Sequence, residues 1–291
     1  MSTQKRQYKI VKGNQFERTF REMLKDSNIF YFMSIDTTGL FTDTFTPEPI
    51  QIVVRKCAYE NGVMNKLGTF TSFIKPECKI PEHITELNHI TNEDVDNAPR
   101  VDAVFARLYE LMEPHANIIG YNMDGFLIPL IKLCGLQTGL MFYDAKYIDL
   151  RDLAESVMYL DKNNGGYRMS NVLSYLGKGD MPTGNAVDNV IAYEYLFNTL
   201  YPLVPTGTDQ AYLTEERFWM KSYRCKYLYL QTTRGRISIN ASNFYIQEET
   251  PGAFDAIDIE NVVKQLTDRH GGMPIWEICR AYEKRAKAVN K

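Results

Sequence analysis

Runs of hydrophobic residues predict where the strands of this chain lie. Residues 29–35 (IFYFMSI) are almost continuously apolar, which is typical of a buried strand. Residues 49–59 predict a second strand, and Asn61-Gly62 directly after it predicts a tight hairpin into a third strand near residues 67–74. The first half of the chain is therefore expected to open as an antiparallel meander.

Helical periodicity follows the meander. Residues 101–112 place Val104, Leu108 and Leu111 on one stripe, and residues 91–94 can cap a helix start before it. Other segments with helical patterns are residues 16–24, 126–133, 150–159, 170–176 and 186–200. A short buried strand is expected at Ile118-Ile119, and a loop at residues 163–166. Helices between later strands indicate a mixed α/β sheet.

The region after residue 202 has a different pattern. Pro202, Pro205 and Gly207 predict a linker. Beyond it, residues 223–232 and 236–246 have strand-like patterns with a hairpin turn between them, and residues 274–289 predict a final helix. We therefore divide the chain into an N-terminal extension (1–27), a main α/β domain (28–202) and a smaller C-terminal β+α appendage (203–291).

Composition limits the function classes. The 291 residues are 44% hydrophobic, which is enough to form a core that needs no metal ion or disulfide bond for stability. The five scattered cysteines contain no CxxC pair. The net charge of −3 argues against a large general surface for nucleic acid, although local basic patches remain possible. Because no signal-like or membrane-spanning apolar run is found, we expect a cytoplasmic protein.

Four segments carry a resemblance to a known family. FMSIDTTGL (32–40), KPECKIPEHITELNHITNEDVDNAP (75–99), GYNMDGFL (120–127) and GNAVDNVIAYEYLF (184–197) follow one another in the order of the motifs of the DEDD, or DnaQ-like, 3′–5′ exonucleases. YIDLRDLA (147–154) also fits the segment between the later motifs. Within the family, the motifs resemble those of exonuclease I. The resemblance implies a ribonuclease H-like fold, a mixed sheet flanked by helices.

The resemblance also implies a catalytic set, and this chain departs from it. Family members hold two Mg²⁺ or Mn²⁺ ions with four carboxylates and use a histidine as general base. Those five positions fall on Ser34, Asp36, Leu127, Asn189 and, for the histidine, Gly184. Only Asp36 is a carboxylate, and one carboxylate cannot hold two adjacent dications. We therefore expect no catalytic activity, no metal and no cofactor.

In an alternative interpretation, the chain is an active exonuclease. Asp124 and Asp188 stand close in sequence to the lost ligands and could replace them in an active exonuclease with relocated metal ligands. A one-residue slip on a helix, however, turns a side chain by about 100° away from the site. Another alternative is a subunit that binds nucleic acid without cleaving it.

Charged and aromatic clusters offer binding surfaces instead. The acidic candidates are Glu77, Glu82, Glu86, Glu93, Asp94, Asp96, Glu248, Glu249, Asp255 and Asp258. The tract FWMKSYRCKYLY (218–229) could stack bases and bind phosphates, but alternating aromatic residues more often pack within a sheet, which is our expectation here.

These observations favour a binding protein on an inactivated nuclease scaffold. An acidic surface would attract another protein that has a basic RNA-binding segment, such as a host ribonuclease complex, and would inhibit it by competing with its nucleic acid. Nucleic acid is not expected as the main ligand of this chain. Membrane attachment is not expected, and a homodimer is the expected assembly because closed dimers are the commonest oligomers.

Overall fold

The computed structural model describes residues 6–112, 115–142, 144–160, 165–222 and 225–289. The chain folds into two compact units. The larger unit consists of Phe16–Ala154 and Leu160–Tyr201, and the smaller unit of Met1–Gln15, Glu155–Tyr159 and Pro202–Lys291. Each unit has its own five-stranded sheet.

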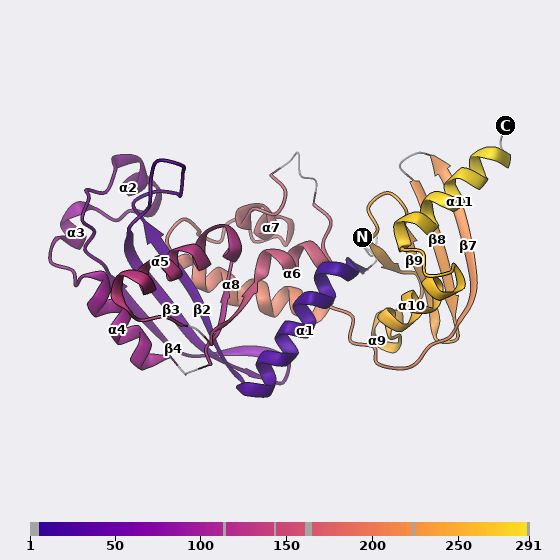
Figure 1. Cartoon of the computed structure of the whole chain (residues 1–291), viewed down its shortest axis with the longest axis horizontal. Helices are drawn as coiled ribbons and strands as arrows, with labels where there is room; N and C mark the ends of the chain where they lie inside the picture. Colours follow the sequence, from indigo (N-terminus) through magenta and orange to yellow (C-terminus); the bar gives the residue numbers. More distant parts are fainter. Residues whose placement is uncertain (1–5, 113–114, 143, 161–164, 223–224, 290–291) are drawn as a thin grey trace. The chain divides into compact units, whose positions relative to one another are not determined.

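The sheet of the larger unit has the strand order β4-β3-β2-β5-β6 (Figure 1). Its strands are β2 (Ile29–Thr37), β3 (Pro49–Glu60), β4 (Val63–Phe73), β5 (Asn117–Gly120) and β6 (Lys146–Asp149). The first three are antiparallel, and β5 and β6 run parallel to β2. The predicted meander and mixed sheet are therefore confirmed.

The hairpin between β3 and β4 has the expected turn. Asn61 and Gly62 have φ angles of 54° and 84°, so both adopt the left-handed conformation of a type I′ turn. The turn lets Glu60 pair directly with Val63.

Helices surround this sheet. They are α1 (Ile10–Asp26), α2 (Glu82–Asn88), α3 (Asn92–Asp96), α4 (Val101–Leu111), α5 (Ile128–Thr138), α6 (Leu150–Val157), α7 (Met169–Tyr175) and α8 (Ala186–Leu200). Thr91 and Asp94 form a capping box at the start of α3, as predicted. The predicted stripe on α4 is wrong at Leu111, which is 40% exposed, because Phe105 instead joins Val104 and Leu108 in the core. The loop expected at 163–166 lies partly outside the described residues.

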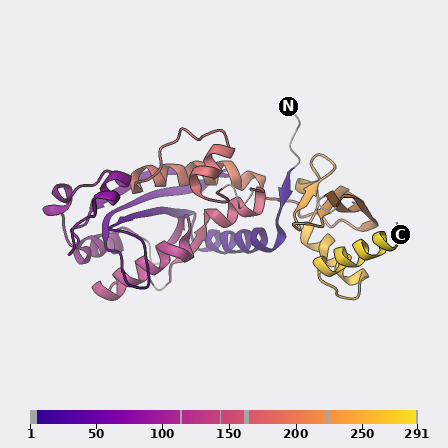
Figure 2. The same cartoon turned by 90° about the horizontal axis from the view of Figure 1, so that it is seen from above.

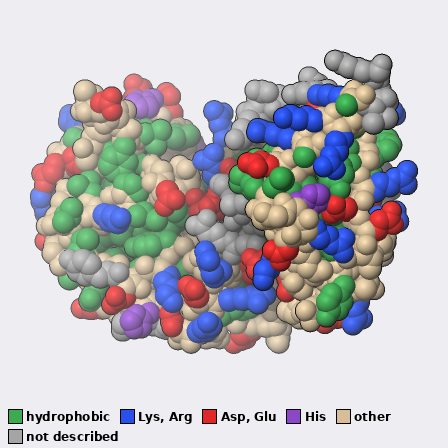
Figure 3. Space-filling view, turned by 45° about the vertical axis from the view of Figure 1, so that its right-hand side comes forward, with side chains coloured by type: hydrophobic (Ala, Val, Ile, Leu, Met, Phe, Trp, Pro, Cys, Tyr) green, Lys and Arg blue, Asp and Glu red, His purple; other side chains and the backbone are tan. Residues whose placement is uncertain are grey.

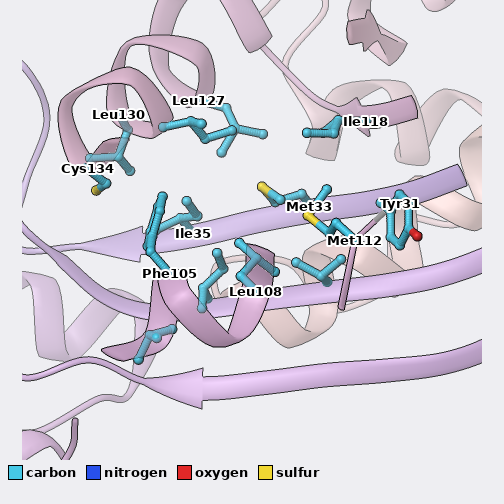
Figure 4. Close-up of a cluster of buried hydrophobic side chains, with 14 of the residues drawn as sticks. Tyr31, Met33, Ile35, Phe105, Leu108, Met112, Ile118, Leu127, Leu130 and Cys134 are labelled. Carbon is cyan, nitrogen blue, oxygen red and sulfur yellow. The ribbon is translucent and has the colours of Figure 1, made fainter. Parts of the chain in front are cut away.

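The two faces of β2 bury different clusters. Tyr31, Met33 and Ile35 pack with α4, η1 (Met123–Leu127, a π-helical turn) and α5, as Figure 4 shows. On the other face, Phe30 and Phe32 pack near aromatic rings of α1 and α8. Because side chains alternate along a strand, Ser34 and Asp36 lie on this second face, toward α8.

The smaller unit has the strand order β1-β10-β9-β8-β7, all antiparallel. Its strands are β7 (Leu213–Ser222), β8 (Cys225–Thr232), β9 (Gly235–Asn240), β10 (Ile246–Glu248) and β1 (Gln7–Tyr8). Its helices are α9 (Ala253–Ala256), α10 (Ile259–Arg269) and α11 (Ile275–Val289). The hairpin turn between β8 and β9 and the final helix are confirmed. The strand expected at 236–246 is wrong in extent, because residues 241–245, which begin with a turn at 241–243, separate β9 from β10.

The compact units differ from the division 1–27, 28–202 and 203–291 at three places. Residues 16–27, expected in the N-terminal extension, belong to the larger unit, where Phe20 of α1 packs on Phe30 of β2. β1 pairs with β10, which places the first residues with the C-terminal region. Residues 155–159 also join the smaller unit, where Tyr245 donates a hydrogen bond to the carbonyl of Met158 at 2.9 Å. Long-range pairing of this kind leaves no local trace in the sequence.

Candidate functional site

The site lies where β2 faces the N-terminal half of α8. Ser34 and Asp36, two residues apart on β2, point to the same side of the sheet. Asn189, on the first turn of α8, donates from Nδ2 to Ser34 Oγ at 3.3 Å. Three of the family positions, 34, 36 and 189, are therefore brought together, and a neutral hydrogen bond joins two of them.

Asp36 is tied to the start of α8. Its Oδ2 accepts the backbone N–H of Ala186 at 2.7 Å, and the residue is only 9% exposed. Burial raises the pKa of Asp36 to about 7, and the nearby charge of Asp188 adds to this, although the Ala186 hydrogen bond opposes it. The carboxyl is thus protonated over much of the acidic range.

Asn185 organises this helix start. Its Oδ1 accepts the N–H of Asp188 at 2.9 Å, which caps α8, and its Nδ2 donates to Asp188 Oδ2 at 2.8 Å. Asp188, one of the two relocated acids considered above, therefore lies near Asp36 but has one oxygen engaged by Asn185. Asp124, the other, is exposed on η1.

Gly184 has a backbone unsuited to the family histidine. Its φ is 128°, a conformation that L side chains rarely adopt, and an added Cβ would lie 3.2 Å from the carbonyl oxygen of Leu87. Its N–H donates to Asn189 Oδ1 at 3.4 Å. A side chain at position 184 would therefore strain the chain.

Leu127 is separated from the other four positions. It is 3% exposed and packs in the core cluster with Leu130 and Met33, on the opposite face of β2 from Ser34 and Asp36 (Figure 4). Its aliphatic side chain fills space between η1 and the sheet.

Two residues near the site were missed by the sequence interpretation. The hydroxyl of Tyr193, one turn after Asn189 on α8, is hydrogen-bonded with Ser34, and burial raises the pKa of Tyr193 to about 12. Asp149, at the end of β6, accepts the N–H groups of Asn122, Met123 and Arg151 at 2.8–3.0 Å. Burial nevertheless raises the pKa of Asp149. Two signals in the sequence were available. Tyr193 stands four residues after Asn189 on α8, and Asp149 ends the short strand β6.

The pair of metal ions that the family resemblance implies does not fit these residues. A hydroxyl and an amide at positions 34 and 189 supply no negative charge, and Asp36 has one oxygen engaged by Ala186. Within the described ranges, no three His, Cys, Asp or Glu side chains are arranged to hold a metal ion.

The first group of acidic candidates lies on the larger unit, around α2 and α3 (Figure 1). All six side chains are exposed: Glu77, Glu82, Glu86, Glu93, Asp94 and Asp96. Glu77 pairs with Arg100, Asp96 lies 3.0 Å from Lys75 Nζ, and Asp94 closes the capping box. Glu82, Glu86 and Glu93 are left without an ion-pair partner among the described residues. In Figure 3, acidic side chains stand at the rim of a broad hydrophobic area on the left-hand body.

The second group lies on the smaller unit and is largely engaged within it. Glu248 is only 9% exposed and accepts the N–H of Phe254, and Glu249 accepts from the Ser238 hydroxyl. Asp255 forms an ion pair with Arg6, and Asp258 caps α10. These carboxylates hold the fold of the smaller unit.

Residues 218–222 and 225–229 of the aromatic tract lie on the paired strands β7 and β8, and their side chains divide between two faces because they alternate along each strand. Phe218 stacks on Tyr282 of α11, with ring centroids 5.7 Å apart, and Lys226 is buried against Glu283. Trp219 is 41% exposed on the other face. The packing expected for the tract is found on one face only, and Arg224 lies outside the described residues.

Comparisons with known proteins agree with the fold. The sequence profile of the family described as Exonuclease matches residues 35–188. A protein of Mycobacterium tuberculosis (strain CDC 1551 / Oshkosh), named as a bifunctional exonuclease/endonuclease, is 24% identical over 220 residues, which is 72% of this chain. The match spans only 33% of that relative.

Solved structures show the same architecture. Exonuclease I of E. coli, in complex with a dT13 oligonucleotide, superposes with a TM-score of 0.51 at 15% identity, covering 74% of this chain and 55% of that one. The nuclease domain of 3′hExo, a DEDDh family member bound to rAMP, gives a TM-score of 0.52 at 14% identity, covering 60% and 92%. The expected ribonuclease H-like fold is therefore confirmed. Across the described residues, every helix is too short or too polar to cross a bilayer.

Proposed function

This chain belongs to the exonuclease family, and from that premise we propose that it is a non-catalytic member that binds another protein. The observation that carries the proposal is the hydrogen bond between Asn189 and Ser34, two positions where the family resemblance places metal-binding carboxylates. Neutral ligands and one tied, readily protonated carboxyl at Asp36 give a pair of dications too little negative charge.

The proposed binding surface is the acidic group on α2 and α3. The segment before α2 is joined to the start of α3, because the Asn92 side chain accepts the N–H of Ile80 at 2.9 Å. Ile84 of α2 and Val95 of α3 also belong to one small core. A rigid array of exposed carboxylates complements a basic segment without a large ordering cost. The engaged carboxylates of the second group play no part in this surface.

The proposed partner is a protein with a basic RNA-binding segment in a host ribonuclease complex. Carboxylates that occupy such a segment would exclude its RNA, which makes this chain an inhibitor. The kind of protein that we propose is a bacteriophage inhibitor of the bacterial RNA degradosome that is built on a degenerate nuclease fold. The inhibition needs no cofactor.

Catalysis is tested with 5′-labelled single-stranded RNA and DNA in Mg²⁺ or Mn²⁺. We expect no shortening by the natural protein. Asp43→Ala, at an exposed acid outside the site, serves as the control for Asp36→Ala and Asp124→Ala. Metal-dependent shortening that disappears in Asp36→Ala and Asp124→Ala and persists in Asp43→Ala would indicate an active exonuclease with relocated ligands and contradict the proposal.

Partner binding is tested by a pull-down from host lysate with identification by mass spectrometry. We expect a ribonuclease complex to be captured by the natural chain and lost when Glu82, Glu86 and Glu93 are all changed to Lys. The matched control changes three exposed acids elsewhere, Asp43, Asp124 and Asp268, to Lys and should retain capture. Equal loss in both variants would point to net charge alone and reject the proposed surface.

A further inference from the structure

The sheet of the smaller unit has one face covered by helices. In Figures 1 and 2, α10 and α11 lie against one side of its strands. The residues beneath them are fully buried: Leu228, Leu230, Ile237 and Ile239. This face supplies the core of the unit, and its stability does not require the opposite face to be covered.

The opposite face carries aromatic and polar side chains in register. Trp219 lies directly across from Tyr227, Arg217 across from Tyr229, and Gln231 across from Arg236. Residues directly opposite in an antiparallel pair share a face, so these side chains form a continuous array over β7, β8 and β9. We call it the open-face array.

A hollow of about 370 Å³ lies on this array. Its lining residues are Glu215, Arg217, Trp219, Tyr229, Gln231 and Arg236. The hollow combines ring faces with guanidinium groups, which is the chemistry that binds a base and its phosphate together.

Both arginines of the array have guanidinium nitrogens without a partner among the described residues. Arg217 has no hydrogen-bond or ion-pair partner within the described ranges. Arg236 donates from Nε to Gln231 Oε1 at 3.0 Å, which leaves its terminal nitrogens free among the described residues. Lys221 adds a third exposed cation near the end of β7, and among the described residues Glu215 is the acid that lines the hollow. A locally positive face on a chain of net charge −3 is selective for an anionic ligand.

We propose that the open-face array binds single-stranded nucleic acid. Bases stack on Trp219 and Tyr229, and the backbone phosphates pair with Arg217 and Arg236. A single strand fits because its bases are free to stack on a sheet surface, whereas those of a duplex are not. The proposal is independent of the protein partner proposed above, because it concerns a different unit and ligands of opposite charge.

Binding is tested by fluorescence anisotropy with fluorescein-labelled dT12 and U12, using the full chain in EDTA. We expect both probes to bind at low salt, and Trp219→Ala to weaken binding about 5- to 100-fold through the loss of one stacking platform. Trp219→Phe, which keeps an aromatic ring, should restore most of the affinity. Trp276→Ala removes the chain's other tryptophan, exposed on α11, and should leave binding unchanged.

The arginines are tested through salt dependence. Arg217→Ala should weaken both probes alike and reduce the slope of log affinity against log salt by about 0.7, as expected for one lost phosphate contact on a single strand. A difference between dT12 and U12 in the natural chain assigns the preference for DNA or RNA.

Three results would overturn the proposal. The first is no binding of either probe at low salt. The second is binding that Trp219→Ala and Arg217→Ala leave intact. The third is a natural dimer that Trp219→Ala converts to a monomer in sedimentation without a change in probe affinity, since the array would then be a contact between two copies of the chain.

Discussion

Asp36 is the carboxyl among the five positions that the family resemblance implies, and its surroundings set its protonation. Ser34 and Tyr193 supply hydroxyl groups nearby, and among the described residues the carboxylate of Asp36 accepts its hydrogen bond from the backbone N–H of Ala186. Desolvation therefore outweighs that bond, and the group is held partly neutral near pH 7. A neutral Asp36 suits a packed junction better than a metal site.

This environment predicts a pH-dependent stability. The unfolded chain ionises Asp36 near pH 4, whereas the folded chain keeps its proton up to about pH 7, so folding takes up a proton between these values. The contribution of Asp36 to stability is complete below pH 4 and is lost as the pH rises to 7. Between pH 5 and pH 8 this amounts to roughly 3 kcal/mol, at about 1.4 kcal/mol per pKa unit.

Asp36→Asn should remove that loss, because an amide still accepts the Ala186 N–H and does not titrate. Urea unfolding of both proteins at pH 5 and pH 8 measures the effect. If the two proteins lose the same free energy between these pH values, Asp36 is not the buried titrating group.

At the scale of elements, the start of α8 positions the site. Asn185→Ala removes the side chain that accepts the Asp188 N–H, and should cost about 1 kcal/mol of unfolding free energy. Arg168→Ala is the matched control, because Arg168 occupies the same capping position of α7 without a side-chain capping bond. Denaturant unfolding compares them, and an equal cost in both would mean that the cap on α8 contributes nothing.

The β3–β4 hairpin allows a second comparison between two glycines. Gly62 has a φ of 84°, so Gly62→Ala should destabilise the protein by about 1 kcal/mol although no atom lies near the new Cβ. Gly68, inside β4, also has open space, but its φ is not in the left-handed range, so Gly68→Ala should be neutral or slightly stabilising. Thermal unfolding that ranks the two variants in the reverse order would exclude backbone conformation as the cause.

At the scale of the whole molecule, the chain has two hydrophobic cores, and tryptophan fluorescence reports on one of them. Both tryptophans, Trp219 and Trp276, belong to the smaller unit, so their fluorescence follows that unit, whereas far-ultraviolet circular dichroism follows both. Glu283→Gln breaks the buried pair with Lys226 and should destabilise the smaller unit by about 3 kcal/mol.

Leu130→Ala is the complementary change, because it empties space in the core of the larger unit and should cost about 2–5 kcal/mol there. We expect Glu283→Gln to move the fluorescence transition, and Leu130→Ala to move the circular dichroism transition while leaving fluorescence in place. Transitions that always coincide would show that the two units unfold as one.

The sequence by itself determined the elements and the family. The apolar run of β2, the Asn61-Gly62 turn and the capping box at Thr91 act over a few residues, so local propensity is enough to predict them. The family resemblance implied that Ser34, Asp36 and Asn189 belong to one site, and in the structure these residues lie where β2 faces the start of α8.

Only the tertiary structure decided how those side chains are used. The separation of Leu127 from the site, the burial of Glu248 and the pairing of β1 with β10 all depend on contacts between distant residues. The same is true of the open-face array. Phe218 and Trp219 alternate along β7, and the packing of α11 against one face decides that Phe218 is covered and Trp219 is exposed. Burial and pairing are properties of the packed chain, and they determine whether a carboxylate or a ring supports the fold or is available to a ligand.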